Sequence, residues 1–416
     1  MQMIKTPVNG MRDISLTEME IRLYLLNKIR EVYTRFGFSE IQTPAVEHIE
    51  NLLSKQGWDN EKLIFKILKR GEKLEKSLAS GLESEIVDSG LRYDLTLPLC
   101  RYYANNRNDL PTPFKAMQIG NVYRADRPQK GRFREFCQCD IDILGDESNL
   151  AEIDLLLATS SFFKEIDFKD FYFDINDRRI LKALILKSGF KEEDFEKVCI
   201  SLDKLDKINV AGVKKELVES GYSINNASDL LDLSHKLNSS NNIYEDLKTN
   251  LSGFIDEEVI NSLYNIVEIL KQNDIDVRLN LSLVRGMGYY TGTIYEIKSE
   301  KLSSSLGGGG RYDEMVGNFI GTLVPASGIS IGFERLITIL MEDNINISSN
   351  VKKIAYLIEK NMPSDRINEI INEAQAERKK GNCIYVSFMA KNKKFQKENL
   401  AKLGFTEFKD YYIERG

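Results

Sequence analysis

Apolar and polar side chains alternate most regularly in the stretch from Val122 to Gly145. An extended run over about residues 117–124 leads into a polar turn, and a second extended run follows over residues 134–144. Every second side chain of the later run shares one face, which collects Phe136, Gln138, Asp140 and Asp142. The pattern predicts a hairpin with one largely polar, acidic face and one apolar face.

Carboxylates that share one face of a strand repel each other unless a cation or an amine lies over them. Arginines of the same hairpin are candidates for that charge: Arg124, Arg127, Arg132 and Arg134. A hairpin held by salt bridges is one interpretation. The better one is a mixed anionic and cationic floor that binds a zwitterion carrying a phosphate.

Helical and extended patterns alternate along the rest of the chain. The capping-box sequence from Ser15 to Glu18 predicts a helix that ends near Gly37, and residues 39–46 then read as a strand that Pro44 confines to an edge or an interface. Later predicted elements are a helix within 62–78, a helix over 149–163, a strand over 170–175, a largely helical region over 176–260 and a strand over 281–296.

The last part of the chain has the pattern of a small βαβαβ unit. Strands are predicted over residues 354–358, 383–388 and 407–411, and helices over 364–378 and 392–403. Right-handed crossovers would make this a parallel sheet.

Length and composition limit the classes of protein to which this chain can belong. With 416 residues, 42% hydrophobic and 29% charged, the chain is long enough for two or three domains. No window approaches 18 consecutive apolar residues and no secretory signal opens the sequence, so we expect a cytoplasmic protein without membrane spans. Five cysteines without a CxxC pair indicate reduced thiols, and only two histidines argue against zinc chemistry or a Ser/His/Asp triad.

A net charge of −6 means that any nucleic acid must be bound through local basic patches. Two clusters are candidates: Lys62, Lys66, Lys69, Arg70, Lys73 and Lys76, and, near the end of the chain, Arg378, Lys379, Lys380, Lys391, Lys393, Lys394 and Lys397. A solvated helix or loop face is an equally good interpretation of each.

Two further stretches carry candidate ligand contacts. Asp94 and Thr96 lie on the same side of a short extended piece before a helix expected from about Pro98, and a carboxylate with a hydroxyl makes a good clamp for an ammonium group. A helix N-cap is the structural alternative for Thr96. Arg285 precedes a glycine in a segment whose glycines let a ligand approach the backbone.

Three motifs give the chain a family resemblance. The sequence RPQKGRFREFCQ (127–138) resembles motif 2 of the class II aminoacyl-tRNA synthetases, and in particular of the histidyl-tRNA synthetases. RGMGYYTGT (285–293) resembles the histidine signature of that family, with Gly288 where aspartate is more common. GISIGFERL (328–336) resembles motif 3, a strand that leads into a helix with Arg335 in its first turn.

The resemblance implies an α/β fold. Its α+β catalytic core would be a class II antiparallel sheet flanked by helices, with a helical insertion and a small C-terminal βαβαβ domain. The expected domains are the core over 1–175 and 261–345, the insertion over 176–260, and an anticodon-binding-like domain over 350–416. The first helix and the strand with Pro44 resemble motif 1, which in the family builds a homodimer interface.

The resemblance also implies a reaction, in which L-histidine is activated with ATP and Mg2+ and then transferred to tRNA(His). Arg124 and Arg285 would be catalytic at the α-phosphate and the carboxylate. The histidine contacts would be Asp94, Thr96, Arg124, Gln138, Asp142, Arg285, Tyr289 and Tyr290. The ATP contacts would be Arg124, Asp126, Arg132 and Arg335, and Gln129 would meet the tRNA acceptor end. The alternative is a non-catalytic paralogue, a regulatory subunit of ATP phosphoribosyltransferase.

Overall fold

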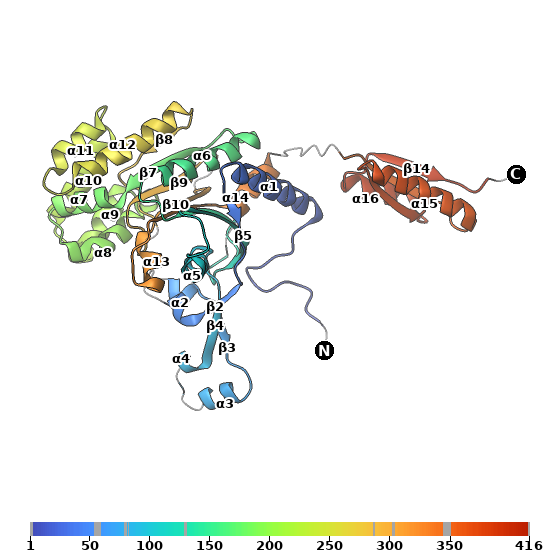
Figure 1. The fold of residues 1–416 in the computed structure, drawn as a ribbon, viewed down its shortest axis with the longest axis horizontal. Coiled ribbons are helices and arrows are strands. Elements are labelled where there is room, and N and C mark those ends of the chain that lie inside the picture. The colour runs from blue at the N-terminus through green and yellow to red at the C-terminus, as the bar shows by residue number, and fades with distance from the viewer. Residues whose placement is uncertain are drawn as a thin grey trace. The chain divides into compact units, whose positions relative to one another are not determined.

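The computed structural model describes residues 3–53, 60–78, 81, 83–128, 131–285, 288–301, 304–343 and 351–414. Its contacts divide the chain into two compact units. One unit contains the residues up to Asp13 together with Leu25–Ile339, and the other contains Ile14–Tyr24 together with the residues from Leu340 onward. Figure 1 shows the ribbon of both.

An eight-stranded sheet forms the centre of the first unit, with the strand order β1-β5-β6-β11-β10-β9-β7-β8. The strands are β1 (Ser39–Glu40), β5 (Phe114–Tyr123), β6 (Glu135–Leu144), β7 (Tyr172–Asp177), β8 (Val277–Leu279), β9 (Thr293–Lys298), β10 (Gly307–Arg311) and β11 (Ala326–Ile331). All pairs from β5 through β7 are antiparallel, and the outer pairs β1·β5 and β7·β8 are parallel. The predicted hairpin is therefore β5 and β6, and the predicted antiparallel core sheet is confirmed.

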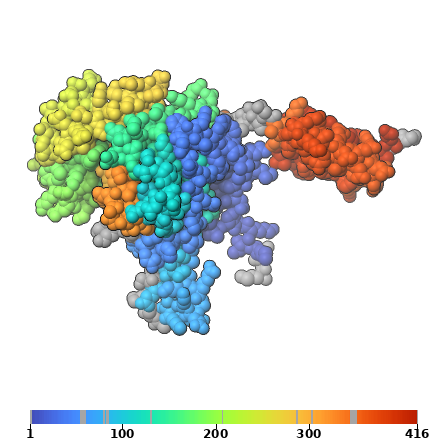
Figure 2. Space-filling model, viewed as in Figure 1, coloured from blue at the N-terminus to red at the C-terminus, as the bar shows by residue number. Residues whose placement is uncertain are grey.

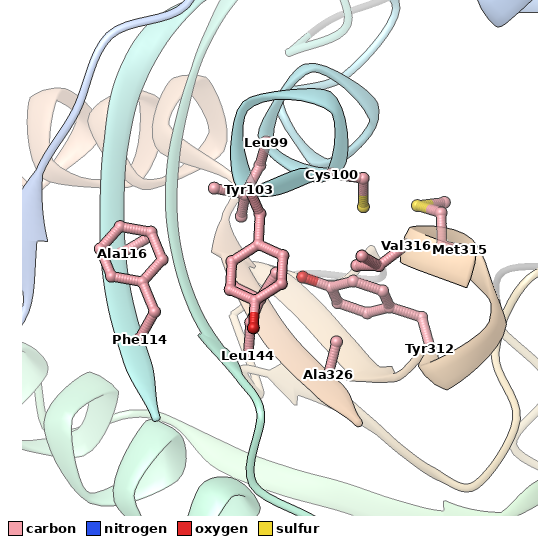
Figure 3. Packing of buried hydrophobic residues seen from close by; sticks show 10 residues of the cluster. All are labelled: Leu99, Cys100, Tyr103, Phe114, Ala116, Leu144, Tyr312, Met315, Val316 and Ala326. Atoms are coloured by element: carbon pink, nitrogen blue, oxygen red, sulfur yellow. The ribbon is translucent and has the colours of Figure 1, made fainter. Parts of the chain in front are cut away.

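Helices flank this sheet, as expected. They are α1 (Leu16–Arg35), α5 (Thr96–Asn106), α6 (Leu150–Glu165), α13 (Asp313–Ile320) and α14 (Phe333–Glu342). The amide of Glu18 donates to Ser15 Oγ at 3.2 Å, which confirms the predicted cap of α1. Figure 3 shows how α5 and α13 pack on β5, β6 and β11, where Tyr103 and Tyr312 lie among small and branched side chains.

A helical part follows β7, in agreement with the sequence pattern. It comprises α7 (Arg178–Lys187), the short 3-10 turn η2 (Glu192–Asp194), α8 (Phe195–Leu202), α9 (Leu205–Glu219), α10 (Ile224–Asn238), α11 (Ile243–Leu251) and α12 (Glu257–Gln272). Its core is apolar and fully buried, with Leu184, Val198, Leu217, Leu230 and Leu247 at 0% exposure. Burial of such side chains stabilises each by about 2 kcal/mol.

A small second sheet has the order β2-β4-β3, formed by β2 (Val46–His48), β3 (Lys66–Leu68) and β4 (Val87–Leu91). Short helices accompany it: α2 (Ile49–Leu53), η1 (Asn60–Leu63), α3 (Glu72–Leu78) and α4 (Glu83–Ile86). Figures 1 and 2 show β3, α3 and α4 projecting from the rest of their unit. In the part of the chain that the structure describes, no helix is long and apolar enough to cross a bilayer.

Two predictions in this region were wrong. The expected strand over 39–46 is split, because β1 ends at Glu40 and β2 begins at Val46 in a different sheet. Pro44 lies in the gap and has no N–H to donate to a ladder. The expected helix over 62–78 is interrupted by β3, which pairs with β4, and Gly71 at φ 56° then turns the chain into α3.

The strand predicted over 281–296 is also wrong for most of its length. Among the described residues of this range, 281–285 and 288–296, the sheet pairing begins with β9 at Thr293. Before it, Asn280 starts a turn in which its carbonyl accepts from the amide of Leu283 at 3.0 Å and its side chain accepts from the amide of Ser282 at 3.0 Å. Local capping of this kind competes with a strand ladder.

The second unit contains the small βαβαβ fold that the sequence predicts. Its strands β12 (Lys353–Ile358), β13 (Cys383–Phe388) and β14 (Glu407–Tyr411) are parallel, in the order β13-β12-β14. The helices are α15 (Ser364–Lys379) and α16 (Lys393–Lys402). Two apolar clusters, one including Tyr356 and Ile370 and the other Leu357 and Leu400, form its core.

Candidate active site

One pocket of about 900 Å³ lies over the central strands of the first unit. It is lined by nearly every candidate residue of the sequence: Asp94, Thr96, Arg124, Asp126, Arg132, Gln138, Asp142, Arg285, Tyr289, Tyr290 and Arg335. The remaining candidate, Gln129, lies outside the described residues. Residues from β6, β10, β11, α5 and α14 thus meet in one space, although the lining residues span more than 200 positions of the sequence.

The acidic end of the pocket is formed by β6, as its period-two pattern predicts. Asp140 and Asp142 are almost fully buried, at 4% and 3% exposure, and Asp94 lines the same cavity. Burial raises the pKa of all three carboxyls, and the pKa of Asp142 reaches about 7. The Asp94 charge adds to the rise at Asp142, whereas the Tyr312 hydroxyl opposes it by donating to Asp142 Oδ1 at 2.6 Å.

Two buried acceptor atoms in this end have no hydrogen-bond donor within the described residues. They are Gln138 Oε1 and Asp142 Oδ2. The other atoms of both groups are engaged, since Gln138 Nε2 donates to Ser330 Oγ at 3.0 Å and Asp142 Oδ1 accepts from Tyr312. Buried acceptors without donors are costly, so this end of the pocket suits a ligand that brings N–H groups.

Asp94 and Thr96 are arranged differently from the prediction. Helix α5 begins at Thr96, two residues before the expected start at Pro98, so Thr96 belongs to the first turn and is not an N-cap. Asp94 performs the capping role, because its Oδ1 accepts from the amide of Leu97 at 3.1 Å. Both side chains still line the pocket.

Tyr289 and Tyr290 form one wall beside the acidic end. Their ring centroids are 4.4 Å apart, and the hydroxyl of Tyr289 donates to that of Tyr290 at 3.3 Å. Burial raises the pKa of both phenols, so they stay neutral at physiological pH. Two neutral aromatic rings with hydroxyl tips make a suitable wall for a flat, polar ring.

The opposite end of the pocket is cationic. Arg124 lies 4.2 Å over the ring of Tyr93 and 5.1 Å from that of Phe136, and its Nε donates to the carbonyl of Tyr93 at 3.1 Å. Arg285 pairs with Glu296 at 3.0 Å and donates to the carbonyl of Gly307 at 3.0 Å. These contacts fix the direction of both guanidinium groups.

Arg335 and Arg132 complete the cationic end. Arg335 is in the first turn of α14, as predicted, and donates to the carbonyl of Ser305. Arg132 pairs with Asp126 at 2.7 Å. Burial and the neighbouring charges of Arg285 and Arg132 lower the pKa of Arg335. Crowded guanidinium groups that repel one another favour an anionic ligand, and phosphate matches their planar donors.

The glycine run from Gly307 to Gly310 belongs to a central strand, β10. A Cβ on Gly309 would lie 1.9 Å from the carbonyl oxygen of Gly328, and one on Gly308 would lie 2.7 Å from Arg285 Cζ. The first four residues of β10 are therefore glycines because the neighbouring backbone and the side chain of Arg285 occupy the space that a Cβ would need.

Several residues that shape the pocket are missed by sequence reasoning. Glu296 and Ser305 hold Arg285, Tyr312 and Ser330 hold the acidic end, and Glu334 pairs with Arg12 at 3.0 Å. Glu334 could have been found, because it precedes Arg335 in GFERL. Glu193, Glu196 and Lys197 also line the cavity from η2 and α8, and no local pattern ties them to it.

A family model described as Histidyl-tRNA synthetase matches residues 10–336 of this chain. A histidine–tRNA ligase of Leifsonia xyli subsp. xyli is 39% identical over 421 residues, which cover 97% of this chain and 94% of the relative. A histidine–tRNA ligase of Azobacteroides pseudotrichonymphae is 37% identical and covers 84% of this chain and 78% of the relative.

Two solved structures share the fold of this chain. The histidyl-tRNA synthetase from Nostoc sp. PCC 7120 aligns with a TM-score of 0.78 at 27% identity, over 97% of this chain and 90% of the other. A Bacillus halodurans structure described as an ATP phosphoribosyltransferase regulatory subunit/histidyl-tRNA synthetase aligns over the full length of both chains with a TM-score of 0.80. At 20% identity, this second likeness shows the fold alone.

Proposed function

Because the chain belongs to the histidyl-tRNA synthetase family, we propose that its pocket activates L-histidine with ATP through the residues described above. The activity is that of a histidine–tRNA ligase, which forms histidyl-adenylate and then transfers histidine to tRNA(His). The regulatory-subunit alternative is not favoured, since the curated relatives are histidine–tRNA ligases.

Histidine would occupy the acidic end of the pocket. Its α-ammonium group would donate to Asp94, Thr96 and Gln138, and its imidazole N–H would donate to Asp142 Oδ2 against the wall of Tyr289 and Tyr290. The observation that carries this assignment is the pair of buried acceptors without donors, Gln138 Oε1 and Asp142 Oδ2. An amino acid without a donor at the ring position would leave the Asp142 atom unpaired, which disfavours it strongly.

ATP would occupy the cationic end. We assign Arg124 and Arg285 to the α-phosphate and the histidine carboxylate, and Arg132 and Arg335 to the outer phosphates, with Asp126 orienting Arg132 through their 2.7 Å pair. Phe136 would stack on the base, since its ring already lies beside Arg124. Bidentate guanidinium donors match phosphate oxygens better than a lysine would.

Mg2+ would enter with ATP. Within the described residues, no group of three or more His, Cys, Asp or Glu side chains could hold a metal ion, so a resident metal site does not fit this pocket. Mg2+ prefers oxygen ligands and commonly binds through substrate phosphates, which fits a nucleotide-borne ion. The protein's own positive charge at the α-phosphate would come from Arg124 and Arg285.

Activation needs no general base, because the carboxylate of histidine is already ionised at pH 7. One of its oxygens attacks the α-phosphorus, the bond to the bridging oxygen breaks, and pyrophosphate leaves with that electron pair. The arginines spread the charge that develops on the phosphoryl oxygens, and their positions are set before the reaction by their contacts with Glu296, Ser305 and Tyr93.

The wider assignments follow the family. Residues 1–175 and 261–345 would form the catalytic core, 176–260 the helical insertion and 350–416 an anticodon-binding domain. Gln129, in the motif 2 turn, would meet the tRNA acceptor end. We also propose a cytoplasmic homodimer built on α1 and the segment that follows it, which sedimentation of the purified protein would test.

Exchange of pyrophosphate into ATP tests the proposal directly. Purified protein with Mg2+ is given each of the twenty amino acids in turn, and exchange is expected with histidine alone. Calorimetric binding of histidine without exchange would contradict the enzyme assignment and would leave a non-catalytic histidine-binding protein.

A further inference from the structure

The small sheet β2-β4-β3 carries a groove that no part of the proposed chemistry uses. Its volume is about 520 Å³, and its lining residues are Val46, Ile67, Leu68, Lys69, Arg70, Lys73, Asp88 and Ser89. Val46 and Leu68 are 47% and 53% exposed, so they form an apolar ledge among the lining residues.

The groove is strongly cationic. Lys69, Arg70 and Lys73 line one side, and Asp88 is the one acidic residue among the lining positions. Within the described part of the chain, none of the three cations forms an ion pair with a carboxylate. The protein as a whole carries a net charge of −6, so the charge of this patch is opposite in sign to the net charge of the molecule. Such a local excess of positive charge is typical of a surface that meets a polyanion.

The position of the groove indicates which polyanion it meets. The segment that leads into β3 is tied to the catalytic sheet, because the amide of Ala125 donates to the carbonyl of Leu63 at 2.8 Å. Ala125 lies between Arg124 and Asp126, at the start of the motif 2 turn. From Leu63 to Lys69 the chain covers about 20 Å when extended, at about 3.3 Å per residue. The groove is therefore within reach of an RNA helix whose end enters the pocket.

We propose that this groove binds the sugar-phosphate backbone of the acceptor arm of tRNA. The proposal rests on the proposed function, since it assumes that the acceptor end is delivered beside the motif 2 turn. Lys69, Arg70 and Lys73 neutralise phosphates, and the ledge of Val46 and Leu68 covers the adjoining sugars. This contact positions the acceptor arm and takes no part in histidine activation.

The test uses the full-length protein and a triple variant, Lys69→Ala, Arg70→Ala and Lys73→Ala. The dissociation constant for an acceptor-arm minihelix of tRNA(His) is measured over a range of KCl concentrations. Loss of three phosphate contacts is expected to weaken binding about 10- to 100-fold at low salt and to reduce the slope of log Kd against log salt by about 2 to 3. Binding of an anticodon stem-loop should not change.

Asp88→Asn is the matched variant in the same groove. It removes the negative charge of the one acidic lining residue. It should therefore tighten minihelix binding, whereas the triple variant weakens it. Histidine-dependent pyrophosphate exchange, which needs no tRNA, should stay at the wild-type level in both variants and reports that the catalytic unit is folded.

An unchanged minihelix Kd and salt slope in the triple variant would overturn the proposal. Equal weakening of minihelix binding and of anticodon stem-loop binding would overturn it as well. Altered subunit association with unchanged RNA binding would also overturn it, because the groove would then be a protein-binding surface. If wild-type protein bound the minihelix through these residues but showed no exchange with histidine, the proposed function would fail while the groove remained an RNA site.

Discussion

At the scale of single residues, Asp142 links histidine recognition to pH. Its folded-state pKa of about 7 lies above the ordinary value of 3.8 because the carboxyl is buried. The folded protein therefore holds a proton that the unfolded chain has lost, and stability falls as the pH rises from about 4 to 7. An asparagine at this position does not titrate.

We expect Asp142→Asn to gain stability relative to the wild type as the pH is raised. Between pH 5 and pH 8 the difference in unfolding free energy should move by roughly 2 to 3 kcal/mol in favour of the variant. Urea unfolding of ligand-free protein at the two pH values measures this. Parallel behaviour of the two proteins would show that the Asp142 carboxyl is already ionised in the free pocket.

Histidine binding should reverse that protonation. With an imidazole N–H donating to Asp142 Oδ2, the carboxylate form is favoured, so at pH 7 binding should release about half a proton from a group that titrates near 7. Calorimetry in buffers of different ionisation enthalpy counts this release. Asp142→Asn should bind histidine at least tenfold more weakly and lose this contribution, and an undiminished proton release would assign it to another group.

Arg285 is the residue on which activation should depend most. Arg285→Ala is expected to reduce histidine-dependent exchange by about 1000-fold, the size of effect seen when one donor to a developing anion is lost. The fold should survive, because Glu296 keeps its ion pair with Lys298 at 3.0 Å. Arg285→Lys keeps the charge without the paired donors and should recover part of the activity. Wild-type exchange rates in Arg285→Ala would remove this residue from the mechanism.

At the scale of elements, two glycines of β10 lie against functional side chains of different ends of the pocket. Gly308 lies against Arg285 at the cationic end, and Gly310 lies against Tyr290 at the acidic end. A Cβ at Gly308 would lie 2.5 Å from the carbonyl oxygen of Tyr295 and 2.7 Å from Arg285 Cζ, whereas one at Gly310 would lie 2.6 Å from the carbonyl oxygen of Thr293 and 3.0 Å from Tyr290 Cδ1. Both substitutions press on the backbone of β9, and a side chain at Gly308 is also strained by its φ of 155°. They differ in which functional side chain they displace.

Gly308→Ala presses on Arg285, which is assigned to both substrates, so it should raise the KM for ATP as well as the KM for histidine. Gly310→Ala presses on Tyr290 and should raise the KM for histidine alone. Exchange assays with one substrate varied at a time measure the two constants, and thermal unfolding measures the stability that each variant loses. The same pair of changes in both variants would mean that β10 acts only as a structural strand.

Sequence patterns predicted the elements whose side chains follow one period throughout. The hairpin β5 and β6, helix α1 and all five elements of the C-terminal unit lie within a few residues of their expected bounds. The acidic face of β6 was found because polar and apolar side chains alternate along it, although both faces are buried from Cys139 to Leu144. Elements defined by neighbours distant in sequence were not found. The first four residues of β10 are glycines, which form no polarity pattern, and β3 is a strand only because β4 pairs with it.

The same limit of sequence-based prediction applies to the residues of the pocket. Candidate residues inside recognisable motifs converge in it, but Tyr312, Ser305 and Glu196 reach it only through the fold. The β-branched and aromatic residues of 281–296 suggested a strand, but the Asn280 side chain instead supports a turn up to Leu283, and Tyr289 and Tyr290 lie outside the strands.

At the scale of the whole molecule, activation and tRNA recognition should be separable. All lining residues of the large pocket lie between Tyr93 and Arg335, within the first unit. The second unit has its own parallel sheet and its own apolar clusters around Tyr356 and Leu357. Its exposed side chains include the aromatic rings of Tyr385, Phe388 and Phe395 and the ammonium group of Lys394, which are suited to stacking and to phosphate contacts.

Removal of residues 351–416 should therefore leave histidine-dependent pyrophosphate exchange within about twofold of the wild type, because no atom of the pocket is deleted. Charging of tRNA(His) should fall by at least tenfold in kcat/KM, about 1.4 kcal/mol of transition-state stabilisation. Comparing exchange and charging in one preparation makes the truncated protein its own control for folding. Loss of both activities in a truncated protein that still binds histidine would show that the second unit supports catalysis as well as tRNA binding. Charging at the wild-type rate would instead restrict tRNA recognition to the first unit.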